Sequence, residues 1–387
     1  MISTHRERQI ARASEALTAR GGGFVDLPTL LPASLVLELA GEGLRPRLFF
    51  ATAPDGTDMC LRPDLTIAAA TQYVADSSYD NDPFAWACQG KVFRAPRDNE
   101  DRPPEFVQIG LERFGDTDSV TTDVTIFLAA WNACQAADVT RLTTRFCDGG
   151  LLPTIIAGAD MPEVWRTALL EQTAHSRAFL NILALASGKD VEKGTPRTIS
   201  ALEQELATLP SEAALIRVQE ALTQGELSLA ATRTAEDVTR RLQVRAKRTL
   251  SPKLPPQIAQ TLHELATFTQ TANMDVTFDH VVALAARLGV DLNTWRAHWQ
   301  ARLAAIKADA PDALTNARFD ALGEEAFDYY DGMAFDIATS DDFTRPVASG
   351  GRYDRLVGEI SGGTRHARAI GCVIRPDRFG PDANGEH

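Results

Sequence analysis

The feature that most constrains the fold is a long helix-like block between two strand-like blocks. Residues 24–150 mix short β-like segments with turns, and strand-like segments return after Asn316. Between about Pro162 and Lys307 the pattern is helical, with segments rich in Ala, Leu, Glu and Arg. One sheet interrupted by helices explains this order most simply, so we predict an α+β fold, an antiparallel sheet flanked by helices with a helical insertion.

The boundaries of individual elements follow from turn and breaker residues. Strand-forming runs bounded by Pro, Gly, Asp or Asn occur at Leu48–Ala51, Asp58–Leu61, Lys91–Ala95, Glu105–Glu112 and Val139–Phe146. Helical runs occur at Ala201–Ala207, Ser211–Thr223, Ala235–Ala246 and Pro256–Thr271. At the N-terminus, Ile10, Ala13 and Leu17 share one helical face, which predicts a folded amphipathic helix and not a signal peptide.

Composition narrows the class of protein. At 387 residues the chain exceeds one usual compact core, so we expect two structural units. No apolar run approaches the roughly 20 residues of a membrane span. A net charge of −13 disfavours nucleic-acid phosphate as a partner, although a local basic patch is able to override it. Five widely spaced cysteines without a C-x-x-C pair predict no disulfide framework, no metal site and a reducing, cytoplasmic location.

The segment Glu105–Glu112 is the most informative local pattern. Its alternation of apolar and polar residues predicts a strand that presents Gln108 and Glu112 together, above a gap left by Gly110. Such a pair predicts a floor for a small polar ligand. The alternative is a solvent-facing edge strand. We expect Lys91–Ala95 to pair with this strand through a hairpin loop at Pro96–Pro104.

Two later segments have a similar character. In Tyr330–Ile337 an aromatic or polar group alternates with small residues, so Tyr330, Ala334 and Asp336 share a face with Gly332. The segment Ser349–Leu356 (SGGRYDRL) is, as an isolated pattern, more typical of a glycine turn than of a phosphate loop.

Together these segments resemble the class II aminoacyl-tRNA synthetases, and specifically the histidyl-tRNA synthetase family. The matches cover roughly residues 1–150 and 313–378 in the family's order. Gly23–Ala33 resembles motif 1 of the family, Leu61–Thr66 resembles its R-P-E-G-T segment, and Phe93–Gly115 resembles motif 2. Asp328–Tyr330 and Ser349–Leu356 resemble the two histidine signatures, and His366–Arg378 stands in the place of motif 3.

The resemblance implies a pocket for histidine. It assigns Asp64 to the α-amino group, Gln108 and Glu112 to the bound amino acid, and Tyr330 and Tyr353 to the imidazole. Arg94 matches an arginine that contacts the α-phosphate and the carboxylate. The histidine-binding candidates are therefore Asp64, Thr66, Arg94, Gln108, Glu112, Tyr330 and Tyr353.

Two departures from the family predict the loss of catalysis. Glu325 stands where the family has a catalytic arginine, and Ile374 stands at the motif 3 arginine position, with Arg375 one step out of register. Activation of an amino acid by ATP needs cations around the phosphoryl group. We therefore expect no catalytic residue and no cofactor.

The chain has only nine residues after Arg378, where the family continues into an anticodon-binding domain, so we expect no tRNA-reading module. In this it resembles the regulatory subunits of short-form ATP phosphoribosyltransferase. That resemblance implies a homodimer through motif 1, a complex with a short catalytic subunit in the first step of histidine biosynthesis, activation of that subunit, and feedback inhibition by histidine. The alternatives are a pocket that no longer binds histidine, a divergent histidyl-tRNA synthetase or amino-acid-activating ligase, and a translation or stress-signalling module.

The resemblance also divides the chain. It predicts a synthetase-like core over residues 1–150, a mainly helical insertion over 151–312, the remainder of the core over 313–380 and a tail over 381–387. Within the insertion, Trp295 and Trp299 lie four residues apart on one helix face and mark a contact with the core or with a partner subunit.

Overall fold

A mixed sheet forms the centre of the computed structural model, which describes residues 4–76, 83–97, 102–173, 175–188, 200–227, 234–270, 274–321 and 329–380. The strand order is β1-β5-β6-β12-β11-β10-β7-β9-β8. Pairs are antiparallel except β1 with β5 and β7 with β9. The strands are β1 (Gly23–Phe24), β5 (Phe84–Phe93), β6 (Glu105–Phe114), β7 (Thr143–Asp148), β8 (Thr269–Gln270), β9 (Arg318–Asp320), β10 (Met333–Ala338), β11 (Ala348–Arg352) and β12 (Ala369–Ile374).

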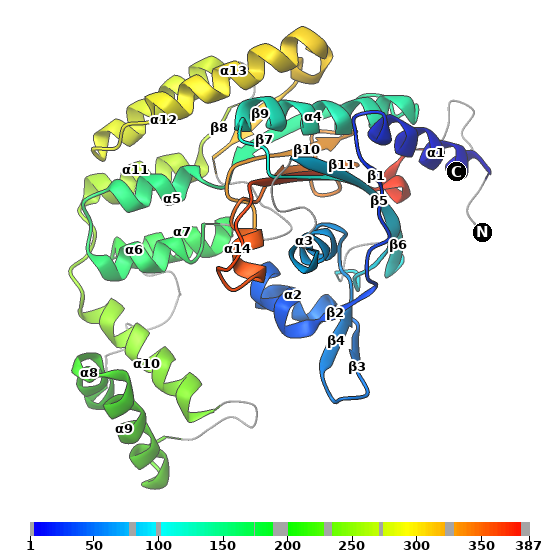
Figure 1. The fold of residues 1–387 in the computed structure, drawn as a ribbon. Helices are drawn as coiled ribbons and strands as arrows, with labels where there is room; N and C mark the ends of the chain where they lie inside the picture. Colours follow the sequence, from blue (N-terminus) through cyan, green and yellow to red (C-terminus); the bar gives the residue numbers. More distant parts are fainter. Residues whose placement is uncertain are drawn as a thin grey trace.

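Helices cover both faces of this sheet (Figure 1). Helices α1 (Thr4–Thr18) and α4 (Ser119–Ala136) lie on one face, with α13 (Asn293–Asp309) packed against α4. On the other face lie α2 (Ala33–Ala40), α3 (Thr66–Ala75) and α14 (Leu356–Ile360), beside a small sheet of β2 (Leu30–Pro32), β4 (Asp58–Leu61) and β3 (Phe50–Thr52). The predicted α+β class with a mainly antiparallel sheet is confirmed.

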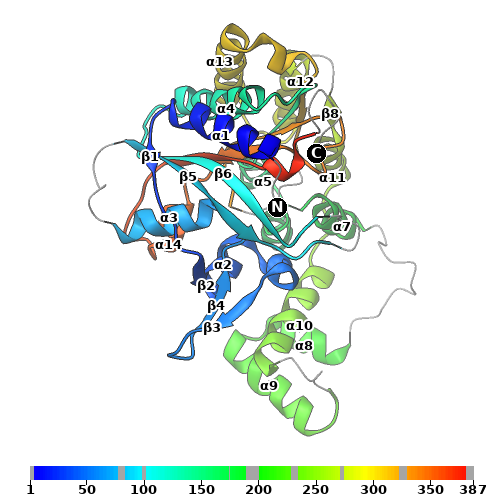
Figure 2. The same ribbon diagram turned by 90° about the vertical axis from the view of Figure 1, so that its right-hand side faces the viewer.

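The helical block contains the remaining helices. They are α5 (Leu151–Gly158), α6 (Glu163–Leu170), α7 (Ser176–Ala186), α8 (Ala201–Thr208), α9 (Ser211–Thr223), α10 (Ala235–Leu250), α11 (Pro256–Thr267) and α12 (Met274–Arg287). One hydrophobic cluster runs from the sheet into α5–α7 and α11–α13, whereas α8–α10 have a small cluster of their own. Both ribbon views show α8–α10 as a group set away from the sheet (Figures 1 and 2). No described helix has the length and apolar character needed to cross a bilayer.

The hairpin of β5 and β6 confirms the expected pairing, with Lys91 opposite Val107 and Phe93 opposite Glu105. Part of its loop, residues 98–101, lies outside the described residues. Strand β6 also pairs with β12, so it is interior to the sheet and not an edge strand. The gap expected at Gly110 is filled, because a Cβ there would lie 2.9 Å from Cys88 Sγ.

The bounds of two other expected elements also differ in the structure, one because of a local turn and one because of pairing with a distant strand. Val139–Phe146 becomes a strand only from Thr143, because Asp138 and Arg141 have positive φ angles of 59° and 57° and turn the chain. The helix expected to reach Thr271 ends at Thr267, and the next residues form β8, which pairs with β9.

The glycine turn expected in Ser349–Leu356 is instead part of β11. Gly350 and Gly351 pair with residues of β10 and β12 on either side. A Cβ on Gly350 would lie 2.5 Å from the Gly371 carbonyl oxygen, and one on Gly351 would lie 2.6 Å from the Tyr330 ring. The glycines therefore serve close approach between neighbours and not a turn.

Candidate functional site

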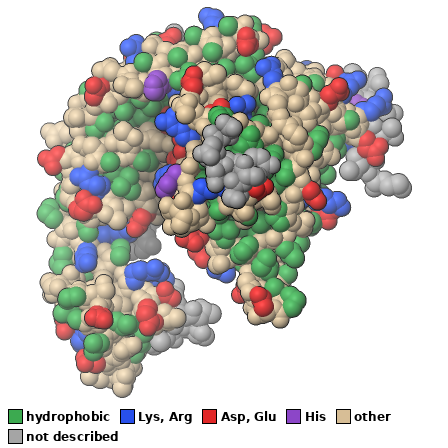
Figure 3. Space-filling view, viewed as in Figure 1, with side chains coloured by type: hydrophobic (Ala, Val, Ile, Leu, Met, Phe, Trp, Pro, Cys, Tyr) green, Lys and Arg blue, Asp and Glu red, His purple; other side chains and the backbone are tan. Residues whose placement is uncertain are grey.

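A cavity of about 670 Å³ opens beside the sheet. Its walls are residues of β7, β10, β11 and β12, the segment that follows β12, and the start of α7. The space-filling view shows Lys and Arg side chains and a histidine gathered beside a hollow near the centre of the face (Figure 3). Among its lining residues, Asp64, Tyr329 and Tyr330 contact one another and are called the acidic end here. Arg94, Arg375 and Arg378 also line the cavity and are called the arginine end.

Asp64 stands at the acidic end, between β4 and α3. Its Oδ1 accepts a hydrogen bond from the Ile67 N–H (3.0 Å), so the side chain caps the start of α3. Its Oδ2 accepts a hydrogen bond from the Tyr329 hydroxyl (3.2 Å), and the residue is 1% exposed. These two hydrogen bonds hold the Asp64 carboxyl group in place.

Glu112 of β6 is the second acid. Its Oε1 accepts a hydrogen bond from Thr66 Oγ1 (2.7 Å), and its Oε2 accepts one from the Tyr353 hydroxyl. Gly371 lies directly opposite on β12. A Cβ on Gly371 would lie 1.5 Å from Glu112 Oε2, so the glycine provides the space that the carboxylate occupies.

Gln108 lies behind the same wall and is completely buried. Its Oε1 accepts a hydrogen bond from the Leu65 N–H (3.2 Å). Its Nε2 has no hydrogen-bond partner among the described residues. An unpaired buried donor is costly unless a ligand or water satisfies it, which is typical of a binding site.

Burial sets the protonation of this end. It raises the pKa of Glu112 to about 8, against the opposing effect of the hydrogen bonds from Tyr353 and Thr66. Burial also raises the pKa of Asp64, and it raises the pKa values of the Tyr329 and Tyr353 phenols well above their usual range. Two buried acids and two phenols suit an ammonium group and an imidazole, because a cation would favour the ionised carboxylates.

Arginines are the most numerous charged residues in the cavity. Nine arginines but only four aspartates line it, in a chain with a net charge of −13. Arg94 and Arg375 are 4% and 3% exposed. Burial, with Arg375 as the largest charge effect, lowers the pKa values of Arg94 and Arg378 to about 9. Like charges held together in this way favour an anionic group nearby.

Arg375 lines the cavity although it stands one residue after the motif 3 arginine position. Ile374 is the last residue of β12 and is completely buried in the hydrophobic core. Arg375 follows the strand and donates a hydrogen bond from Nη1 to Ser349 Oγ (2.9 Å). A cation therefore lies near Arg94 even though Ile374 occupies the expected arginine position.

The structure brings most of the sequence-predicted residues together. Asp64, Thr66, Arg94 and Tyr330 line the cavity. Gln108, Glu112 and Tyr353 are buried behind this lining, where Glu112 bonds Thr66 and Tyr353 bonds Glu112. Glu325 and Asp328 lie outside the described residues. Sequence reasoning missed Tyr329 and Arg378, and it set Arg375 aside as one step out of register; the adjacent tyrosines of the D-Y-Y segment were a signal for Tyr329.

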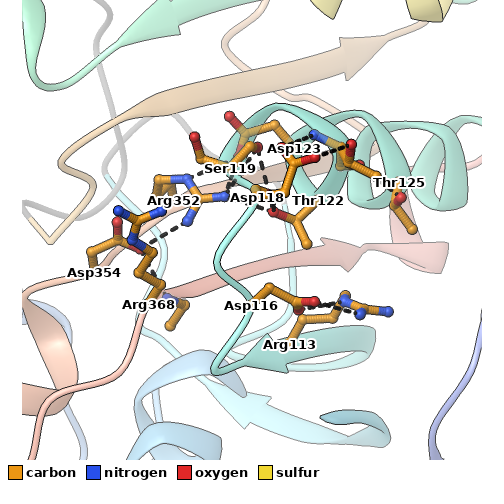
Figure 4. A network of polar contacts seen from close by, with 12 residues as sticks. Arg113, Asp116, Asp118, Ser119, Thr122, Asp123, Thr125, Arg352, Asp354 and Arg368 are labelled. Carbon is orange, nitrogen blue, oxygen red and sulfur yellow. Dashed lines mark hydrogen bonds and ion pairs between the residues drawn. The ribbon is translucent and has the colours of Figure 1, made fainter. Parts of the chain in front are cut away.

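Arg352, in the second histidine signature, holds Tyr353 in place. Its Nε and Nη2 donate to Asp123 Oδ1 of α4 (2.9 and 2.6 Å), and its Nη1 donates to Asp354 Oδ1 (2.9 Å). Figure 4 shows this network and its further contacts to Ser119 and Thr122. The guanidinium group of Arg352 is therefore already paired with two protein carboxylates, those of Asp123 and Asp354. The described residues contain no cluster of His, Cys, Asp or Glu suited to a metal ion.

Comparison with known proteins adds to this geometry. The family model described as histidyl-tRNA synthetase matches residues 2–254 and 218–378. The ATP phosphoribosyltransferase regulatory subunits of Brucella anthropi and Brucella ovis are 29% and 28% identical to this chain, each over 94% of both sequences.

Solved structures show the same fold. An ATP phosphoribosyltransferase regulatory subunit/histidyl-tRNA synthetase from Bacillus halodurans superposes with a TM-score of 0.60 at 18% identity, covering 96% of this chain and 77% of that one. A histidine–tRNA ligase subunit from Alicyclobacillus acidocaldarius gives a TM-score of 0.57 at 19% identity, covering 97% and 91%.

Proposed function

This chain belongs to the histidyl-tRNA synthetase family, and from that premise we propose that it is a non-catalytic regulatory subunit of short-form ATP phosphoribosyltransferase, in the first step of histidine biosynthesis. The Brucella relatives with that name match it over 94% of both sequences. Its partner is a short catalytic subunit that needs this chain for activity. All five cysteines are buried and none forms a disulfide in the described residues, in keeping with work in the reducing cytoplasm.

The observation that carries the proposal is the acid and phenol network of Asp64, Glu112, Tyr329 and Tyr353. It offers carboxylates to an α-ammonium group and hydroxyls to an imidazole. Histidine is therefore the effector. Binding inhibits the partner when histidine prefers the inactive arrangement of the complex, with a coupling free energy of about 1–3 kcal/mol.

A homodimer through the motif 1 region is part of the proposal. Phe24, Leu30 and Phe50 are 59%, 47% and 50% exposed, and all three lie in or beside that region. Large apolar side chains gathered on a surface are typical of an interface. A two-fold symmetric pair would bury the same side chains on both subunits.

The test is reconstitution with a short-form catalytic subunit. We expect phosphoribosyl transfer only when both chains are present, and inhibition when histidine is added. Glu112→Gln mimics the protonated acid but is unable to ionise, so the variant complex should stay active and lose sensitivity to histidine. Glu105→Gln is the matched control, because Glu105 lies at the exposed start of the same strand. Full activity of the catalytic subunit alone, or a native complex indifferent to histidine, contradicts the proposal.

The arginine end favours one alternative, a divergent histidyl-tRNA synthetase or amino-acid-activating ligase. Arg94, Arg375 and Arg378 remain together in the cavity, and cations of this kind stabilise a phosphoryl group in transfer. Histidine-dependent exchange of pyrophosphate into ATP distinguishes the two functions. We expect none from the purified chain, and measurable exchange would favour the alternative.

A further inference from the structure

Helix α13 is joined by polar contacts, one buried and two partly buried, to both segments that carry the tyrosines Tyr330 and Tyr353. Three of its side chains make these contacts, and they lie on one face at spacings of four and three residues: Trp295, Trp299 and Arg302. Trp299 and Arg302 are 0% and 7% exposed. The two tryptophans bond Asp148, near Tyr330, whereas Arg302 bonds Asp123, near Tyr353.

The first contact reaches the Tyr330 segment through Asp148. Asp148 Oδ2 accepts hydrogen bonds from the indole N–H groups of Trp295 (2.8 Å) and Trp299 (2.9 Å). The next residue, Gly149, donates its N–H to the Gly332 carbonyl (2.8 Å). A Cβ on Gly149 would lie 2.4 Å from the Tyr330 carbonyl oxygen, so the backbone after Asp148 touches the backbone of the tyrosine itself.

The second contact reaches Tyr353 through Asp123. Arg302 Nε donates to Asp123 Oδ2 (2.7 Å), while Arg352 holds Oδ1 of the same carboxylate. Asp123 is completely buried between the two guanidinium groups. Since Arg352 immediately precedes Tyr353, the position of α13 bears on the position of that phenol and of the Glu112 carboxylate that accepts its hydrogen bond.

The two tyrosine segments are also joined to each other. Asp331 Oδ1 accepts the Asp354 N–H (3.0 Å), and its Oδ2 accepts the Arg355 N–H (2.8 Å). The Asp331 N–H donates to the Arg352 carbonyl (3.0 Å). Both walls of the pocket and α13 are thus linked by short polar contacts, so displacement of one strains the others.

We infer that Trp299 and Arg302 are positioning residues of the amino-acid pocket, and that α13 couples occupancy of the pocket to the position of the helical block. The inference takes only the identity of the ligand, histidine, from the proposed function. The positioning role itself is a property of the empty chain. A physical coupling of this kind is shown by the effect of a distant substitution on ligand affinity and on the protection of the pocket backbone.

Arg302→Met is the sharpest variant. It leaves Asp123 paired with Arg352, so no buried carboxylate is left without a partner and the fold should survive. Arg296→Met is the matched control, since Arg296 lies on the same helix but pairs with Asp279 of α12. Trp299→Phe keeps an aromatic side chain, although a smaller one, and removes the indole N–H, and it serves as a second variant if Arg302→Met fails to fold.

The first measurement is amide hydrogen exchange of the full empty chain. We expect faster exchange in residues 329–334 and 349–356 of Arg302→Met, partial rescue in Arg302→Lys, and native exchange in Arg296→Met. The second measurement is calorimetric titration with histidine. Arg302→Met should bind roughly 2- to 30-fold more weakly than the native chain, and histidine should slow exchange in residues 293–309 only when Arg302 is present.

Unchanged exchange and unchanged affinity in Arg302→Met and Trp299→Phe would overturn the inference and leave the proposed function intact. If the native chain fails to bind histidine, the proposed effector is wrong, but exchange in the empty variants still decides whether α13 positions the pocket. Equal losses in Arg302→Met and Arg296→Met would show general loosening and would also count against the inference.

Discussion

The Tyr353 hydroxyl donates a hydrogen bond to Glu112, and both side chains are completely buried. The pair joins the second histidine signature to the strand of motif 2, which is 241 residues away along the chain. Because this carboxyl group is buried, it keeps its proton to a higher pH than a surface acid does, which affects both stability and ligand binding.

The stability of the empty chain should fall as the pH rises through the range that Glu112 controls. Its pKa is raised from an ordinary 4.5 to about 8. The folded chain therefore keeps a proton that the unfolded chain releases, so the stabilisation is complete below about pH 4.5 and is lost as the pH approaches 8. The slope due to this group is at most about 1.4 kcal/mol per pH unit. Urea unfolding at several pH values measures it, and Glu112→Gln should flatten the curve.

Histidine should bind more tightly as the pH rises from about 7 to 8. The ligand's ammonium group favours ionised Glu112 and Asp64, so binding releases protons that burial had retained. Affinity should change by up to about tenfold per pH unit for each proton released. Calorimetry in two buffers with different ionisation enthalpies counts the protons. A proton count of zero in the native chain would contradict the raised pKa of Glu112.

Gly371→Ala should destabilise the chain and abolish histidine binding. The new Cβ would lie 1.5 Å from Glu112 Oε2, so the strand or the carboxyl group must move. Overpacking of this kind typically costs about 1–3 kcal/mol. Gly43→Ala is the control, because a Cβ there meets nothing within 4 Å. Thermal unfolding and histidine titration of both variants check the prediction, which fails if they behave alike.

Phe50→Ser should convert the proposed homodimer to monomers. Phe50 is 50% exposed on β3, in the small sheet whose strand β2 belongs to motif 1. Loss of its apolar surface weakens a two-fold contact twice, once on each subunit. Ile216→Ser is the control, since Ile216 is 58% exposed but lies on α9, away from this sheet. Sedimentation velocity decides the question, and a dimer that survives Phe50→Ser argues for another interface.

Local signals were enough to predict several elements of the fold. The helix Ser211–Thr223 and the strand Asp58–Leu61 have the predicted ends, because breaker residues bound them in the sequence. Errors arose where partners are distant. The two glycines of β11 imitate a turn, and only the crowding by β10 and β12 explains them.

The site shows the same division. The family resemblance selected Asp64, Gln108, Glu112 and Tyr353, each of which is buried in the structure. The alternation of apolar and polar residues placed a gap at Gly110, whereas the space for Glu112 comes from Gly371, which is more than 250 residues away. Arg375 was set aside as out of register, because its direction depends on where β12 ends, and strand ends are set by pairing and not by local composition.

The separate hydrophobic cluster of α8–α10 has a consequence for how such chains diversify. Leu206, Ala214 and Val218 fill that small core, and none of them packs in the core of the sheet. Substitutions there leave the packing around Glu112 and Tyr353 untouched. Natural selection is therefore free to reshape, lengthen or replace this unit without rebuilding the pocket, and we expect it to diverge fastest among relatives that share the same sheet.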